Sequence, residues 1–192
     1  MKKLALGCSL STLLIVLGVL TAALWGGSCY VTLTGEEVRV ESAWTRLENA
    51  CLHRIDLAGE LLAIGRQVSA IPRDDLDRLA DALDRSSELV ASPEVLARPE
   101  AAETFEDAQD QLVSAVGALL EGHGAQLDQR APEAMRRLRA QYAQVDERVA
   151  EAEGQLDQAV EQYNRAVTGF PHRAVATLLG FDSRVFAPPH AR

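Results

Sequence analysis

The sequence predicts an all-α protein, and three observations support that fold class. The chain is 47% hydrophobic but only 5% aromatic, so aromatic strand formers are scarce. No segment alternates apolar and polar residues with the two-residue period of a half-buried strand. Residues 132–170 instead repeat apolar side chains at alternating spacings of three and four. That pattern is the seam of a long helix that packs against other helices.

Residues 4–25 form an uncharged, mostly aliphatic segment that follows Lys2 and Lys3. A helix of this length spans about 33 Å, which is enough to cross a bilayer. Trp25 and Tyr30 stand where interfacial aromatic residues are expected. Because the lysines precede the span, the positive-inside rule predicts a cytoplasmic N-terminus and an extracytoplasmic remainder. We therefore expect residues 1–30 to be a single-pass anchor that contacts the lipid bilayer through residues 4–25.

Two other interpretations of this segment stay open. A charged start, an apolar core and the small residues Gly26, Gly27 and Ser28 also fit a cleaved signal peptide. Lipidation at Cys29 is the second interpretation, although Gly26, three residues before the cysteine, stands where a bulky aliphatic residue is usual. An uncleaved anchor and a lipid anchor would both tether the rest of the chain to a membrane.

Four helices are expected after the anchor, at about residues 36–70, 73–91, 93–121 and 131–170. The first opens at Gly35 after a Thr-rich spacer, and Pro72 ends it. Gly122-His123-Gly124 is expected to end the third helix. Pro132 and Pro171 delimit the last. Short connections make consecutive helices antiparallel neighbours, so residues 31–171 should form a long up-and-down four-helix bundle.

Arg54 occupies a core-register position in the first of these helices. The other seam positions are Val40, Trp44, Leu47, Cys51, Ala58, Leu61, Gly65 and Val68. In one interpretation Ile55 takes the core, and Arg54 reaches the surface or pairs with Asp56 or an acid on a neighbouring helix. In the other, Arg54 anchors a buried polar network that fixes helix register, since unpaired burial of its charge would be costly.

Residues 172–192 form a short apolar tail beyond the last helix, with Gly180-Phe181 near its middle. One role for the tail is to fold back and plug an end of the bundle. The alternative is contact with lipid or with a partner protein, because an apolar segment on a polar surface is unusual.

The formal net charge of the chain is -9. Its only lysines are Lys2 and Lys3, so removing these two charges from -9 leaves about -11 for the rest. Such an acidic surface repels phosphates and argues against a nucleic-acid partner. Three scattered cysteines are too few for a disulfide framework, so free thiols are expected, with Cys51 as a small core residue.

No arrangement typical of an enzyme or cofactor site occurs in the sequence. The four histidines lack the Glu-x-x-His and His-x-x-x-His spacings of helical metal sites. A phosphate-binding glycine loop and a Gly-x-Ser-x-Gly elbow are also missing. We therefore expect a protein that is not an enzyme, with no catalytic, cofactor-binding or metal-binding residues.

The first and last helices carry motifs with the order and spacing of a known family. They are Val40-Glu41-Ser42-Ala43-Trp44, Leu47-Glu48, Arg54-Ile55-Asp56-Leu57, Ala159-Val160, Tyr163-Asn164, Phe170-Pro171, Gly180-Phe181 and Phe186. Over residues 30–186 the chain resembles the LemA family. That resemblance implies a membrane-anchored, mostly extracytoplasmic antiparallel helical bundle without an established activity or cofactor. Some relatives act in membrane-remodelling or organelle-forming assemblies.

The family motifs supply the candidate interaction residues. They are Trp44, Arg54, Asp56, Tyr163, Asn164, Phe170, Pro171, Gly180 and Phe181. Purely structural roles, with Tyr163 in the core and Asn164 as a solvated or locally bonded amide, are the alternative. The leading hypothesis is a scaffold or adaptor that offers helix faces and its tail to envelope proteins or to copies of itself. A sensor that binds a ligand between extracytoplasmic helices is the second, and an envelope enzyme is the third.

Overall fold

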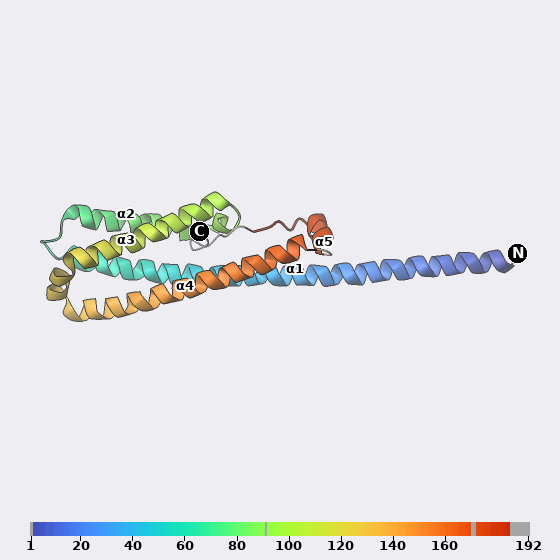
Figure 1. Cartoon of the computed structure of the whole chain (residues 1–192), viewed down its shortest axis with the longest axis horizontal. Coiled ribbons are helices and arrows are strands. Elements are labelled where there is room, and N and C mark those ends of the chain that lie inside the picture. The colour runs from blue at the N-terminus through green and yellow to red at the C-terminus, as the bar shows by residue number, and fades with distance from the viewer. Residues whose placement is uncertain (1, 91, 170–171, 185–192) are drawn as a thin grey trace. The chain divides into compact units, whose positions relative to one another are not determined.

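The computed structural model describes residues 2–90, 92–169 and 172–184, and all regular secondary structure in these ranges is helical (Figure 1). The elements are α1 (Lys2–Gly65), α2 (Arg73–Val90), the 3-10 helix η1 (Pro93–Leu96), α3 (Pro99–Arg130), α4 (Pro132–Thr168) and α5 (His172–Leu179). The all-α prediction is confirmed.

The chain divides into two compact units. Unit 1 contains Met1–Arg39 and Glu161–Ser183, and unit 2 contains Val40–Val160 and Arg184–Arg192. The helices α1 and α4 therefore contribute residues to both units. Most of the predicted seams belong to unit 2, whereas the apolar N-terminal segment and α5 belong to unit 1.

The helix α1 is longer than the sequence suggested. We expected a spacer before Gly35, but the helix continues without a break from Lys2 to Gly65. Thr32 and Thr34 fit inside it because their hydroxyl groups donate to the carbonyl oxygens of Ser28 and Tyr30, at 3.1 and 2.9 Å. This bonding to the preceding turn lets threonine residues occupy a helix interior.

The same helix ends earlier than residue 70. Gly65 is its last residue, and a turn follows before Pro72. A Cβ atom at Gly65 would lie 2.8 Å from Leu76 Cδ2, so a larger residue here would force the Leu76 side chain of α2 to shift. Close packing of Leu76 against Gly65 accompanies the break, whereas Pro72 restricts only Ile71.

The prediction that Gly122-His123-Gly124 ends the third helix is wrong, because α3 runs on to Arg130. Two glycines cost a helix about 2 kcal/mol relative to alanine. Contacts offset this cost: His123 Nε2 lies 3.0 Å from Asp75 Oδ2 of α2, and Leu127 is fully buried beyond the glycines. The helix ends where Ala131 precedes Pro132.

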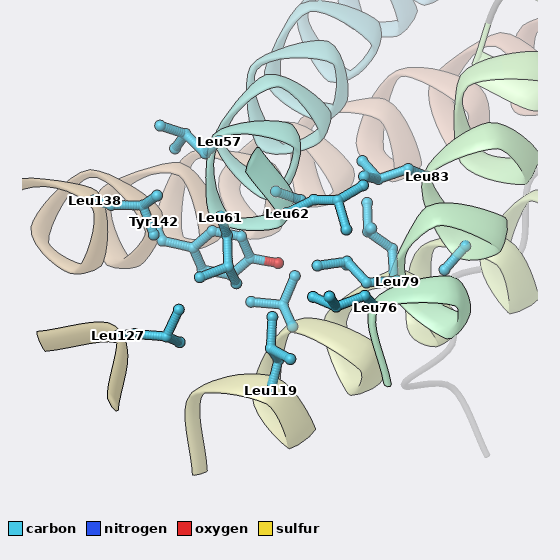
Figure 2. Packing of buried hydrophobic residues seen from close by; sticks show 14 of the residues in the cluster. Leu57, Leu61, Leu62, Leu76, Leu79, Leu83, Leu119, Leu127, Leu138 and Tyr142 are labelled. Atoms are coloured by element: carbon cyan, nitrogen blue, oxygen red, sulfur yellow. The ribbon is translucent and has the colours of Figure 1, made fainter. Parts of the chain in front are cut away.

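The core of unit 2 is a continuous apolar cluster to which four helices contribute (Figure 2). In Figure 2, leucines of α1, α2 and α3 and the pair Leu138 and Tyr142 of α4 point toward one another. The seam predicted for the first long helix is buried at every position from Val40 to Gly65. Along α4, the seam is buried from Met135 to Tyr163. The spacing in the sequence therefore identified the packed faces of both long helices.

Polar contacts also join the helices of unit 2. Ser86 Oγ of α2 donates to the carbonyl oxygen of Ala108 in α3 at 3.0 Å, and both groups are buried. Arg46 of α1 donates to Gln155 Oε1 of α4 at 2.9 Å. At the corner between α3 and α4, Arg139 pairs with Asp128 at 2.9 Å.

The N-terminal part of α1, in unit 1, is long and apolar enough to cross a membrane. Between Leu13 and Leu20 its large aliphatic side chains are exposed, and Leu24 is 76% accessible. A signal sequence near the N-terminus meets the same criterion of length and composition. The structure thus agrees with a membrane-anchoring segment and does not show its orientation.

Candidate functional site

Arg54 lies at the centre of a polar layer inside unit 2. We define this layer as Arg54 of α1, Gln109 of α3, and Tyr142 and Asp146 of α4. Arg54 is only 7% exposed, and its Nε lies 3.0 Å from Asp146 Oδ1. Its Nη1 donates a longer bond of 3.4 Å to Gln109 Oε1. The geometry therefore favours the buried network over a surface arginine, and the acidic partner is Asp146.

The polar layer is not saturated with hydrogen bonds among the described residues. Gln109 Nε2 and the Tyr142 hydroxyl are buried and have no partner there, and the Arg54–Asp146 contact is an ion pair without hydrogen-bond alignment. Burial, followed by the charge of Asp146, raises the pKa of Tyr142 to about 12. The phenol therefore stays neutral at physiological pH.

Acidic side chains gather between α3 and α4 in the same unit. Burial, followed by the carboxylates of Glu153, Asp110 and Asp157, raises the pKa of Glu106 above its ordinary value of 4.5. Burial also raises the pKa of Asp157. One carboxylate oxygen of Glu106 and one of Asp157 are buried without a hydrogen-bond partner in the described part of the chain. These groups therefore stabilise the folded state better when they are protonated.

The Cys51 thiol is buried and faces this polar region. Burial raises its pKa to about 12, and the charge of Arg54 only partly opposes that effect. A thiol that remains protonated is a poor nucleophile. Cys29 is also buried, and both cysteines are free, as the sequence predicted.

The two remaining candidates of the first long helix differ in their surroundings. Trp44 is nearly buried, and its ring packs on Phe105 of α3 with centroids 5.6 Å apart and a tilt of 58°. Asp56 is exposed and does not pair with Arg54. Trp44 thus joins two helices of unit 2, whereas Asp56 lies on its surface.

The candidates near the C-terminus meet in unit 1, where α5 turns back toward α1. Tyr163 is 1% exposed, and its hydroxyl donates to the carbonyl oxygen of Asp182 at 3.0 Å. Phe181 makes an edge contact with the ring of Tyr30, with centroids 6.3 Å apart. The side chain of Asn164 is partly buried. We call this arrangement of Tyr30, Tyr163, Phe181 and Asp182 the tail junction.

Gly180 makes the tail junction possible. Its φ of 77° lies in the left-handed region, which glycine adopts without strain. The N–H of Phe181 donates to the carbonyl oxygen of Ala176 at 3.0 Å, which completes a Schellman cap at the end of α5. Gly180 therefore has a conformational role. Phe170 and Pro171 lie outside the described residues.

A surface groove of about 360 Å³ lies between α1 and α4 in unit 2. Its lining includes the polar side chains of Arg46, Asn49, His53, Arg148 and Glu151. This groove could not be predicted from the sequence, because its polar residues lie beside the apolar seams and resemble ordinary solvated positions.

Metal binding finds no support in the part of the chain that the structure describes. Within residues 2–90, 92–169 and 172–184, no group of three His, Cys, Asp or Glu side chains has a geometry that could hold a metal ion. The carboxylates near Glu106 belong to a single acidic cluster without such a geometry.

These features define an all-helical protein whose long first helix begins with a segment apolar enough to span a membrane. Comparison with protein-family models finds the LemA family over residues 43–188, which is most of the chain. The chain therefore belongs to the LemA family, and the resemblance seen in its motifs is confirmed. A comparison with curated proteins finds no match.

Proposed function

We propose that this LemA family member is a membrane-anchored interaction protein of the cell envelope, a scaffold or adaptor without catalytic activity. The observation that carries the proposal is the uncharged segment of residues 4–35, which belongs to the same continuous helix as the first seam of unit 2. A span needs about 20 apolar residues, so this segment supplies a full crossing and a short apolar exit.

The proposal includes the orientation of the chain. Lys2 and Lys3 precede the span, and the remaining chain is strongly acidic. The positive-inside rule then favours a cytoplasmic N-terminus and an extracytoplasmic unit 2. The acidic surface of unit 2 favours protein partners or self-association over nucleic acid.

We further propose that unit 2 is an antiparallel up-and-down four-helix bundle. Arg54 of α1 pairs with Asp146 of α4, and Arg46 of α1 contacts Gln155 of α4. Residue numbers on α4 therefore increase in the direction in which those on α1 decrease. The contacts of α2 with α3 follow the same rule, since Ser86 meets Ala108 while Asp75 meets His123. Opposite progressions of this kind support antiparallel neighbours.

Intact-mass measurement and cross-linking test the proposal in two stages. Mass spectrometry of the purified protein should show a chain that retains residues 4–25, and a species that begins at or after residue 24 would contradict the anchor. Cross-linking in the native membrane should then join unit 2 reproducibly to particular envelope proteins. Recovery of cross-links only between copies of the chain would replace the adaptor role with self-assembly, and a chain that forms neither would contradict an interaction role.

Ligand binding is the second candidate function, and the groove of unit 2 favours it. Its volume of about 360 Å³ lies in the range of small-molecule sites. Arg46, His53 and Arg148 outnumber the one acid, Glu151, in its lining, so a small anionic ligand is the best chemical match. Calorimetric titration of small dicarboxylates into the protein and into an Arg148→Gln variant tests this function. Absence of binding by the unmodified protein would contradict it for this ligand class.

A further inference from the structure

Acidic residues are distributed unevenly between the two units. The chain has 28 Asp and Glu residues, but residues 162–181 contain none, and they include the cations Arg165 and Arg173. Residues 4–35 are uncharged. Both stretches belong to unit 1. An acid-free surface next to an apolar span is compatible with an anionic lipid surface, which repels carboxylates and attracts arginine.

The tail junction brings these two stretches together. Phe181 contacts Tyr30, and the Tyr163 hydroxyl holds the backbone at Asp182. The Schellman cap at Gly180 fixes the direction in which the chain leaves α5. The end of α5 is therefore held beside the part of α1 that follows the apolar span.

Large apolar side chains are exposed at this position. Leu178 is 85% exposed and Leu179 is 51% exposed at the end of α5. On α1, Val31 is 70% exposed and Tyr30 is 49% exposed. We call Tyr30, Val31, Leu178 and Leu179 the junction patch. Four exposed large apolar side chains near the contact between the Tyr30 and Phe181 rings form a surface that is unusual for a region in contact with water.

The distance from the span matches the depth of a membrane interface. Tyr30 follows Trp25, the interfacial residue at the end of the apolar segment, by five residues, or about 7.5 Å along the helix. Amphipathic elements insert about 5–10 Å into the boundary between headgroups and acyl chains. Leu178 precedes Phe181 by three residues, so chain length alone keeps it within roughly 11 Å of the ring contact.

We propose that the junction patch is a second lipid-contacting surface, which lies in the interface of the same membrane that residues 4–25 cross. Continuity with the span identifies the occupant as lipid rather than a partner protein. Arg173, which is exposed on α5, adds a cation suited to anionic headgroups. This inference rests on the proposed membrane anchoring.

Site-specific fluorescence in vesicles tests the proposal on the full chain. A nitrobenzoxadiazole label is attached at Leu178→Cys in a Cys8→Ser background, where Cys29 and Cys51 are buried and only 3% and 0% exposed. The matched control carries the label at Val113→Cys, an exposed apolar position of unit 2. Both proteins are reconstituted into phosphatidylcholine and phosphatidylglycerol vesicles that contain a lipid with a nitroxide on its upper acyl chain.

Flotation of the vesicles separates the anchor from the patch. The proposal predicts that both proteins float, that the label at position 178 shifts to the blue and is quenched, and that the label at position 113 does neither. A protein that floats with an unquenched label at position 178 overturns the lipid contact and leaves the anchor intact. Equal quenching at both positions overturns a specific patch. A protein that fails to float overturns the anchor and the inference together.

Discussion

The ion pair between Arg54 and Asp146 leads to an asymmetric prediction about two substitutions. Arg54 is 7% exposed, whereas the Asp146 side chain is 41% exposed. Replacing either residue breaks the same contact of 3.0 Å, but each replacement leaves a different charge behind. Asp146→Ala leaves a buried guanidinium, and Arg54→Leu leaves a carboxylate that water can reach. The first substitution should therefore be the more harmful.

The expected cost follows from the burial of the charge that remains. A buried charge that loses its partner costs about 3–5 kcal/mol, and we place Asp146→Ala at the lower end of this range, near 3 kcal/mol. For Arg54→Leu, the main loss is the donor to Gln109 Oε1, about 1–3 kcal/mol, partly offset by the apolar leucine. Its net cost is about 1 kcal/mol. The difference of about 2 kcal/mol corresponds to roughly 4–8 °C in Tm.

Thermal unfolding of the full chain in detergent, followed by far-UV circular dichroism, measures this difference. Arg136→Leu is the control, because Arg136 and Glu133 of α4 form an exposed pair whose loss costs at most about 1 kcal/mol. The Arg54→Leu/Asp146→Leu double variant should regain much of the stability lost by Asp146→Ala, since neither charge remains. If Asp146→Ala lowers Tm no more than Arg54→Leu does, Arg54 reaches water without its partner and the buried network is refuted.

Three further predictions concern other positions of unit 2. Gly65→Ala should lower the free energy of unfolding by about 1 kcal/mol, because the new Cβ would meet a leucine of α2 at 2.8 Å. Gly59→Ala, whose Cβ would have no atom within 4 Å, should raise it by about 0.5–1 kcal/mol, and urea unfolding compares the two variants. The buried Cys51 thiol, with its pKa of about 12, should resist iodoacetamide at pH 8 until the protein unfolds, and rapid labelling of the native protein would contradict its burial. Glu106→Gln and Asp157→Asn should raise Tm at neutral pH. Because both pKa values are raised in the folded state, the protonated carboxyl groups stabilise the protein below their ordinary values of 4.5 and 3.8, and this stability is lost as pH rises through the folded-state values. The increase in Tm caused by the two substitutions should therefore vanish in acid.

The packed faces of the helices could be predicted from sequence because one periodic signal determines them. The seam of α4 stays in register from Met135 to Tyr163, and all of these seam positions are buried. A long run with regular spacing leaves only one stripe available for packing, whatever the partner helices are. The all-α class followed from the same signal.

Helix ends were predicted less well, because local glycine and threonine signals compete with tertiary contacts. Gly35 resembles a helix start and Gly122-His123-Gly124 resembles a helix stop, yet both lie within helices. His123 contacts Asp75 of α2, which lies 48 residues away in the sequence, so local sequence patterns could not predict this contact. The signal of Pro132 was more reliable, since its missing N–H and fixed φ act whatever lies nearby.

The candidate sites show the same division between local and long-range information. Arg54 stood out because a charge in a core register is anomalous within its own helix. Its partners could not be chosen, because Asp146 lies beside the α4 seam and resembles the other solvated acids there. For the tail, the sequence left a fold-back and a contact with lipid or a partner as alternatives, since the contact between Tyr30 and Phe181 joins residues far apart in the sequence.

Charge distribution connects the fold of each unit with the environment proposed for it. Only four of the 28 acidic residues fall in unit 1, namely Glu36, Glu37, Glu161 and Asp182. Unit 2 holds the others, including its partly buried carboxylates. A surface rich in carboxylates is suited to contact with water and with protein partners. Unit 1 combines the uncharged residues 4–35 with residues 162–181, which contain no acid, and this surface would be costly in water but suitable beside lipid. A scaffold that is anchored in the membrane by unit 1 and binds its partners through unit 2 needs its acidic residues in unit 2, since carboxylates in the junction patch would oppose contact with an anionic membrane.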